Sequence, residues 1–226
     1  MDGPAMVTVE AVTLAAHVLV GFVALFAGLG ALGTSKGRRR HRRFGRAYIV
    51  AMAAVSGTAL ALYPMDPGPA RQFLALIAVF SFYFAFSGYR VLSRKRPADD
   101  PAAVDWVAVG LFGLASAGLV ATGVLQYRAG SDFAPVLLVF GAIGTGFAVT
   151  DVWKFRRDTE AGAWVGEHVI RMGAGYIATV TAFSSVNFLF LPLVARWLWP
   201  TLLGTPLLVY FGRVYEDRFG VGVSDA

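Results

Sequence analysis

Long apolar runs alternate with short polar segments along this chain of 226 residues. Several runs contain eighteen or more residues without a charged side chain, which is enough for a helix to cross a hydrocarbon layer about 30 Å thick. The pattern predicts an all-α fold class, a polytopic membrane bundle of seven transmembrane helices in one domain. The predicted spans are residues 7–33, 46–64, 72–92, 104–127, 134–155, 164–192 and 200–214.

The basic residues between the runs predict the orientation of the bundle. The segment 36–48 holds seven of the twenty Lys and Arg residues. Short loops rich in Lys and Arg stay on the cytoplasmic side of a membrane. With that segment inside, sixteen of the twenty basic residues lie in the inner segments of the seven-span arrangement. We therefore expect the N-terminus outside and the C-terminus inside, in the inner or plasma membrane of a cell.

Composition excludes several classes of protein. Hydrophobic residues make up 57% of the chain and charged residues 15%, which is too little polar surface for a soluble domain of this length. The net charge is +6, but the positive residues are confined to the predicted interhelical loops. We therefore expect them to contact the anionic head groups of the lipid bilayer, and we expect no nucleic acid partner. The absence of cysteine excludes disulfides, thiolate nucleophiles and cysteine-ligated metals.

Two pairs of short motifs recur at nearly the same offset, in predicted spans that run in the same direction. They are RFGRAYI at 43–49 with RMGAGYI at 171–177, and Tyr83–Phe84 with Tyr210–Phe211. The motifs suggest an internal repeat in which a connecting helix, 104–127, joins one half, 7–92, to another, 134–218. This 3+1+3 arrangement would be a parallel repeat with a ligand site between its halves. The alternative is chance similarity among abundant glycine and aromatic residues.

Ionisable residues inside predicted spans are the first candidates for function, because the hydrocarbon interior is costly for them. Arg171 is the only arginine or lysine that lies inside a predicted span and not at its inner end, and a buried arginine needs a counter-charge. Asp151 is the first choice for that role and Glu167 the second. A polar, cytoplasm-facing pocket follows as a hypothesis. Its ligand-binding members would be Arg171, His168, Asp151, Tyr176, His41 and Tyr48.

Such a pocket favours an anion, because a guanidinium binds carboxylate or phosphate in two-pronged fashion. The first hypothesis is therefore a membrane protein that binds or transports a small anionic or lipid-like ligand. The structural alternative is a salt bridge in which Arg171 extends to the membrane interface. No nucleophile stands beside a base at a recognisable spacing, which argues against an enzyme.

His17 and Asn187 are further polar residues, in the outer halves of the first and sixth predicted spans. An imidazole that faces lipid is costly, so His17 should point into the bundle. It would serve there as an interhelical hydrogen-bonding group, a proton relay or a haem ligand. A redox protein that binds b-type haem through His17 or His168, or a quinone, is the second hypothesis. The third is an accessory subunit of a larger membrane complex, or a homo-oligomer.

Four separated motifs occur in order along the chain. They are His17 with Gly21 and Gly28, KG and HRRFGR within 36–46, FSFYFAFSGYR at 80–90, and EHVIRMGAGYIATVTAF at 167–183. In this order they resemble an uncharacterised prokaryotic family of predicted membrane proteins, a domain family without an assigned activity. The resemblance implies a polytopic membrane protein. It also implies that function resides at the matching positions His17, His41, Arg43, Gly45, Tyr83, Gly88, His168, Arg171 and Tyr176.

Overall fold

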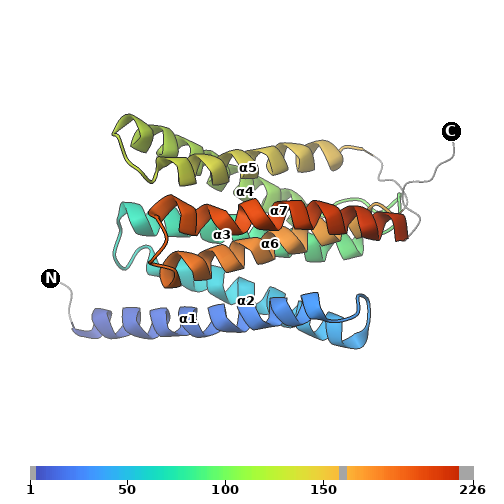
Figure 1. Ribbon diagram of the computed structural model, residues 1–226, viewed down its shortest axis with the longest axis horizontal. Helices are drawn as coiled ribbons and strands as arrows, with labels where there is room; N and C mark the ends of the chain where they lie inside the picture. Colours follow the sequence, from blue (N-terminus) through green and yellow to red (C-terminus); the bar gives the residue numbers. More distant parts are fainter. Residues whose placement is uncertain (1–3, 158–161, 219–226) are drawn as a thin grey trace. The chain divides into compact units, whose positions relative to one another are not determined.

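The computed structural model describes residues 4–157 and 162–218, and seven α-helices contain most of them (Figure 1). The helices are α1 Pro4–Gly33, α2 Arg39–Leu62, α3 Pro69–Arg90, α4 Ala103–Arg128, α5 Ala134–Lys154, α6 Trp164–Asn187 and α7 Leu193–Arg218. A short 3-10 helix, η1 Val91–Ser93, follows α3. The described residues contain no strand, and the all-α fold class is confirmed.

Six of the seven described helices, α1 to α6, are long and apolar enough to cross a membrane. The helix α7 is not among the six, and it contains Pro200 and Pro206. The multi-pass helical bundle is therefore confirmed. The seventh crossing and the orientation of the termini stay predictions.

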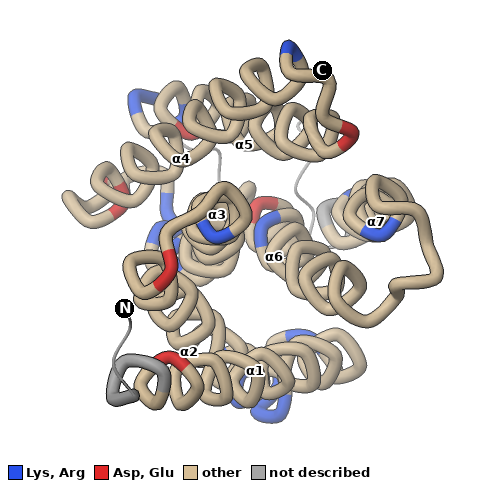
Figure 2. Tube along the Cα trace, turned by 90° about the vertical axis from the view of Figure 1, so that its left-hand side faces the viewer, with Lys and Arg blue, Asp and Glu red and all other residues tan. Residues whose placement is uncertain are grey.

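Large apolar side chains cover the outside of the helices. Leu114 on α4 is 72% exposed and Val50 on α2 is 69% exposed. Charged positions are sparse along the trace in Figure 2, and several polar side chains are buried instead, Ser116 and Asp151 among them. Water would oppose this distribution, whereas hydrocarbon tails solvate apolar side chains well. The chain is an integral membrane protein whose surface suits a lipid bilayer.

Consecutive helices pack in hairpins, α1 with α2, α4 with α5 and α6 with α7. Glycine permits the closest approaches, as is usual between membrane helices. A methyl group added at Gly141 of α5 would lie 2.8 Å from the backbone nitrogen of Val120 on α4. At Gly204 of α7 it would lie 2.6 Å from the side chain of Ile177 on α6.

The chain divides into two compact units, and the division falls inside α3, between Phe82 and Tyr83. The first unit contains α1, α2 and the first part of α3. The second contains the rest of α3 and α4 to α7. The helix predicted to connect two halves, α4, packs against α5. The predicted halves and their repeat stay a prediction.

Helix boundaries differ from the sequence expectation at two places. The basic segment 36–48 is not a loop throughout, because α2 begins at Arg39, seven residues before its predicted start. Arginine is a good helix former, and an exposed guanidinium does not stop a helix. The helix α6 ends at Asn187, before the predicted limit, and α7 begins at Leu193. Pro200 therefore lies inside α7, where neighbouring helices and side chains can compensate for its missing N–H.

Candidate functional site

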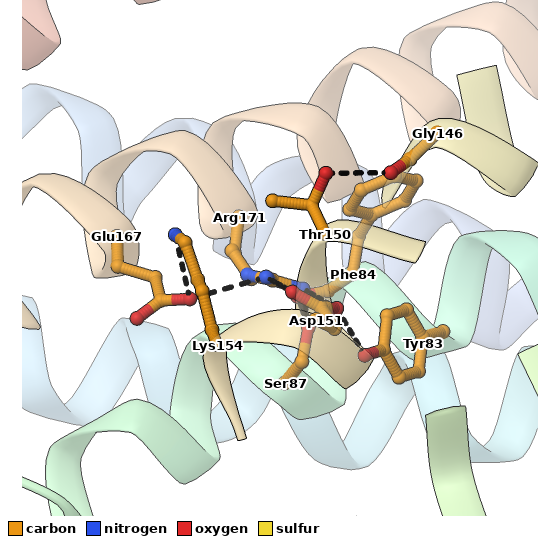
Figure 3. A network of polar contacts seen from close by, with 9 residues as sticks. All are labelled: Tyr83, Phe84, Ser87, Gly146, Thr150, Asp151, Lys154, Glu167 and Arg171. Carbon is orange, nitrogen blue, oxygen red and sulfur yellow. Dashed lines mark hydrogen bonds and ion pairs between the residues drawn. The ribbon is translucent and has the colours of Figure 1, made fainter. Parts of the chain in front are cut away.

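Arg171 and Asp151 form a buried ion pair in the second unit. Asp151 lies in the last turn of α5 and is fully buried, and Arg171, two turns into α6, is 3% exposed. The Nη1 atom of Arg171 donates to Oδ2 of Asp151 at 2.6 Å, and its Nη2 atom donates to Oδ1 (Figure 3). This two-pronged contact is the strong form of an arginine–carboxylate pair. The structure thus brings together the two residues that the sequence paired.

Two side chains of α3 complete the buried part of the cluster. Tyr83 donates its hydroxyl to Oδ2 of Asp151, and the hydroxyl oxygen of Ser87 lies 3.3 Å from Nη1 of Arg171. Residues four positions apart share a helix face, which is how α3 presents both hydroxyls to the same ion pair. Sequence reasoning named Tyr83 only as a motif position and missed Ser87.

Aromatic rings wall the ion pair. The ring of Tyr83 stacks on Phe112 of α4 with 4.0 Å between centroids. The guanidinium carbon of Arg171 lies 5.8 Å from the ring centre of Tyr83 and 5.7 Å from that of Phe147. A guanidinium at this distance from an aromatic ring is attracted by the ring's quadrupole. The rings also keep water and lipid from the charges, which strengthens the pair and raises the cost of breaking it.

Glu167 connects the buried pair to the surface. Its Oε1 atom accepts from Nη2 of Arg171 at 3.1 Å and from Nζ of Lys154 at 3.4 Å. The Glu167 side chain is 17% exposed and that of Lys154 is 45% exposed. The two terminal nitrogens of Arg171 therefore have four acceptor contacts for their four N–H groups. The cluster therefore contains two positive and two negative side chains, and its exposed end is at Glu167 and Lys154.

His168 contacts α3, Tyr176 lies on another part of α6, and their place in a ligand pocket stays a prediction. The Nδ1 atom of His168 lies 2.7 Å from the carbonyl oxygen of Gly88, so this imidazole ties α6 to α3. Gly88 permits that contact, because a methyl group there would lie 3.0 Å from the backbone nitrogen of Met172. Tyr176 is half-buried, and a separation of five residues places it on a different face of α6 from Arg171.

His41 and Tyr48 belong to the first unit. The Nδ1 atom of His41 lies 3.0 Å from the carbonyl oxygen of Ala31, near the end of α1. Lys36 donates to the same carbonyl at 3.2 Å and to that of Leu32 at 2.8 Å. The last carbonyls of a helix have no partner within the helix, so both side chains cap α1. Tyr48 is buried.

His17 also belongs to the first unit, and it links α1 to α2. Its Nδ1 atom lies 2.9 Å from the hydroxyl of Thr58 and 3.1 Å from the carbonyl oxygen of Val55. This is the interhelical hydrogen bond that the sequence offered as one of three roles. Asn187 is the last residue of α6 and is exposed. Its amide donates to the carbonyl of Phe183 at 2.8 Å.

A second ion pair of the second unit was not foreseen from the sequence. The Nε and Nη2 atoms of Arg90 donate to the two carboxylate oxygens of Asp105, each at 2.9 Å. Oδ2 of Asp105 also accepts from the backbone N–H of Ala102 at 2.9 Å, and Asp105 is 3% exposed. The sequence feature that could have indicated Asp105 is an acidic residue in the first turn of a helix. Such a residue accepts a hydrogen bond from a free backbone N–H and interacts favourably with the positive end of the helix dipole.

The described residues contain no group of three or more His, Asp or Glu side chains that could hold a metal ion. Haem binding through one histidine stays a hypothesis, and a visible spectrum tests it. Protein purified after expression with haem supplied should show a Soret band if His17 or His168 is an axial ligand. Replacing that histidine with alanine should abolish the band. A spectrum without a Soret band would exclude the hypothesis.

The comparison with known families is decisive for the class of protein. A profile described as "Predicted membrane protein (DUF2306)" matches residues 14–154, which is more than half of the chain. The chain belongs to this family. The resemblance drawn from the motifs is thereby confirmed. The DUF2306 match includes Tyr83, Ser87 and Asp151, and it ends before Glu167 and Arg171. No curated protein and no solved structure matches the chain.

Proposed function

We propose that this membrane protein binds a small anion at the Glu167 end of the buried cluster, and that it acts as a carrier or receptor for that anion. One observation supports the proposal. The Glu167 carboxylate lies between two cations, Arg171 at 3.1 Å and Lys154 at 3.4 Å, and it remains partly exposed. An internal carboxylate in that position has the contacts that a ligand carboxylate or phosphate would need. Glu167 is thus the group that the anion would displace.

Energetics favour exchange at Glu167 over exchange at Asp151. Removing one partner of a buried ion pair costs about 3–5 kcal/mol, because the other charge is left without compensation. A partly exposed pair such as Glu167 with Lys154 contributes about 1 kcal/mol or less. Asp151 therefore keeps the Arg171 guanidinium in place while Glu167 is exchanged. The incoming anion takes over one N–H group of Arg171 and the ammonium group of Lys154.

The predicted topology gives the site a side of entry. The inner end of α6 follows one of the basic segments that the sequence places in the cytoplasm. Basic residues near an opening raise the local concentration of anions there. The ligand would accordingly enter from the cytoplasm, as the sequence hypothesis of an inner polar site requires.

Glu167→Gln tests the proposal, because it removes the internal competitor and leaves a neutral side chain of the same size. We expect about fivefold tighter binding of small carboxylates or phosphate, which corresponds to about 1 kcal/mol. Isothermal titration of the purified protein in detergent, with a series of mono- and dicarboxylates and inorganic phosphate, measures the effect. Lys154→Gln should weaken the same binding by a similar factor.

Glu10→Gln is the matched control, because Glu10 forms a partly exposed ion pair with Arg71 in the first unit. It removes the same charge at another place and should leave anion affinity unchanged. If Glu167→Gln binds no anion more tightly than the wild-type protein does, Glu167 does not compete with a ligand and the proposal is wrong.

A further inference from the structure

Four exposed arginines of α2 border one open cavity in the first unit. Arg39, Arg42, Arg43 and Arg46 line a cavity of about 330 Å³ at the beginning of the helix. Spacings of three and four residues place all four on one helix face. This arginine face belongs to the first unit and the Arg171 cluster to the second, and the inference below does not depend on the anion site proposed there.

The arginine face lacks internal counter-charges. Across residues 4–157 and 162–218, the ion pairs formed involve Arg71, Arg90, Lys154 and Arg171 and none of the four arginines. Like charges four residues apart on a helix repel each other, and the face contains two such pairs. The helix nevertheless begins at Arg39 and holds the four side chains together. An anion with more than one charge would relieve this repulsion.

The position of the arginine face along α2 indicates where that anion comes from. The apolar part of α2 follows Arg46, and the helix rises about 10 Å along its axis from Arg39 to Arg46. A bilayer of about 40–45 Å has a hydrocarbon core of about 30 Å, which leaves about 5–8 Å of head groups on each side. The four guanidinium groups therefore border the apolar span at the depth of the lipid phosphates.

We propose that the arginine face binds the head group of an anionic phospholipid with two phosphates. Guanidinium groups bind phosphate oxygens in two-pronged fashion, and four of them provide a pair for each phosphate. The pairs lie about one helical turn apart, so one diphosphate lipid engages both. A lipid with a single phosphate would engage only one pair.

Native mass spectrometry and lipid titration in nanodiscs test this inference. The probes are cardiolipin, which carries two phosphates, and phosphatidylglycerol, which carries one, compared at equal total negative charge in a phosphatidylcholine background. We expect the wild-type protein to retain cardiolipin about tenfold more tightly. Arg42→Gln combined with Arg46→Gln should weaken cardiolipin binding about tenfold. Each basic residue near an anionic surface raises the affinity for that surface severalfold.

Arg38→Gln combined with Arg40→Gln is the matched control, because it removes two charges from the same segment outside the cavity. It should weaken cardiolipin binding clearly less than Arg42→Gln combined with Arg46→Gln does, because neither side chain lines the cavity. All six side chains are exposed, so helix content should be unchanged in both double variants. If both double variants lose the same cardiolipin affinity, or if the wild-type protein binds both lipids equally tightly, total charge explains the binding and the proposal is wrong. If soluble pyrophosphate binds as tightly as cardiolipin, the arginine face recognises a free diphosphate, and the proposal of a lipid ligand is wrong.

Discussion

Replacing Asp151 with asparagine is expected to destabilise the protein by about 3–5 kcal/mol. Asparagine has nearly the same shape and can still accept a hydrogen bond, but it cannot balance the buried charge of Arg171. Asp151 is fully buried and makes the two-pronged contact, so neither water nor lipid head groups can replace it. Reversible unfolding in detergent micelles, followed by the loss of helical circular dichroism, measures the change in free energy.

Two further variants distinguish the effect of an uncompensated buried charge from a nonspecific loss of stability. Lys154→Gln removes a charge at the exposed end of the cluster and should cost about 1 kcal/mol or less. Asp151→Leu combined with Arg171→Met removes both buried charges, and it should recover most of the stability lost in the asparagine variant. An asparagine variant within 1 kcal/mol of the wild type would show that Arg171 is compensated by other groups, Glu167 foremost.

The helices were largely predictable because a membrane imposes a length. Charge-free runs of the required length located α1 to α6, and the structure contains helices at each of these places. The ends were less predictable, because apolarity marks the part of a helix inside the membrane and not the helix itself. The helix α2 extends beyond its apolar part through Arg39, and α7 continues through Pro200. Hydropathy does not show that either extension is helical, because residues 39–46 are mostly basic and residues 193–199 directly precede a proline.

The Arg171–Asp151 pair was predictable from a single physical requirement, namely that a charge inside a span needs a counter-charge. The hydroxyl donors and aromatic walls were not, because they depend on which face of α3 is presented to α6. The pair Tyr83 and Ser87 could have been recognised only by its spacing of four residues. His168 was placed near Arg171 by its spacing of three residues, and the contact of its Nδ1 atom with a carbonyl of α3 was not predicted.

The sequence repeat compares residues that occupy different environments. Arg43 is exposed on α2, whereas its counterpart Arg171 is buried in an ion pair. Tyr83 is 4% exposed, whereas its counterpart Tyr210 is 62% exposed. Identical residues at nearly the same offset therefore do not by themselves give equivalent sites. The burial of each charge, which depends on the neighbouring helices, decides whether a motif residue belongs to a polar cluster.

Gly141→Ala is expected to destabilise the protein by about 1–3 kcal/mol, although alanine is the better helix former. An added methyl group at this position of α5 would lie 2.8 Å from the backbone nitrogen of Val120 and 3.2 Å from the carbonyl oxygen of Ser116. Backbone atoms of α4 cannot move aside as a flexible side chain can, so the two helices must separate. Overpacking of this kind costs more than the gain of up to about 1 kcal/mol from helix propensity.

Gly146→Ala supplies the comparison on the same helix, because no atom lies within 4 Å of a methyl group added there. Its unfolding free energy in detergent micelles should equal that of the wild type or exceed it by up to about 1 kcal/mol. The difference between the two alanine variants isolates the cost of separating α4 from α5, since the chemical change is identical. If both variants are equally stable, the close approach at Gly141 does not limit the packing of this hairpin. If Gly141→Ala alone is destabilised, the glycine is required because the backbones of α4 and α5 touch there.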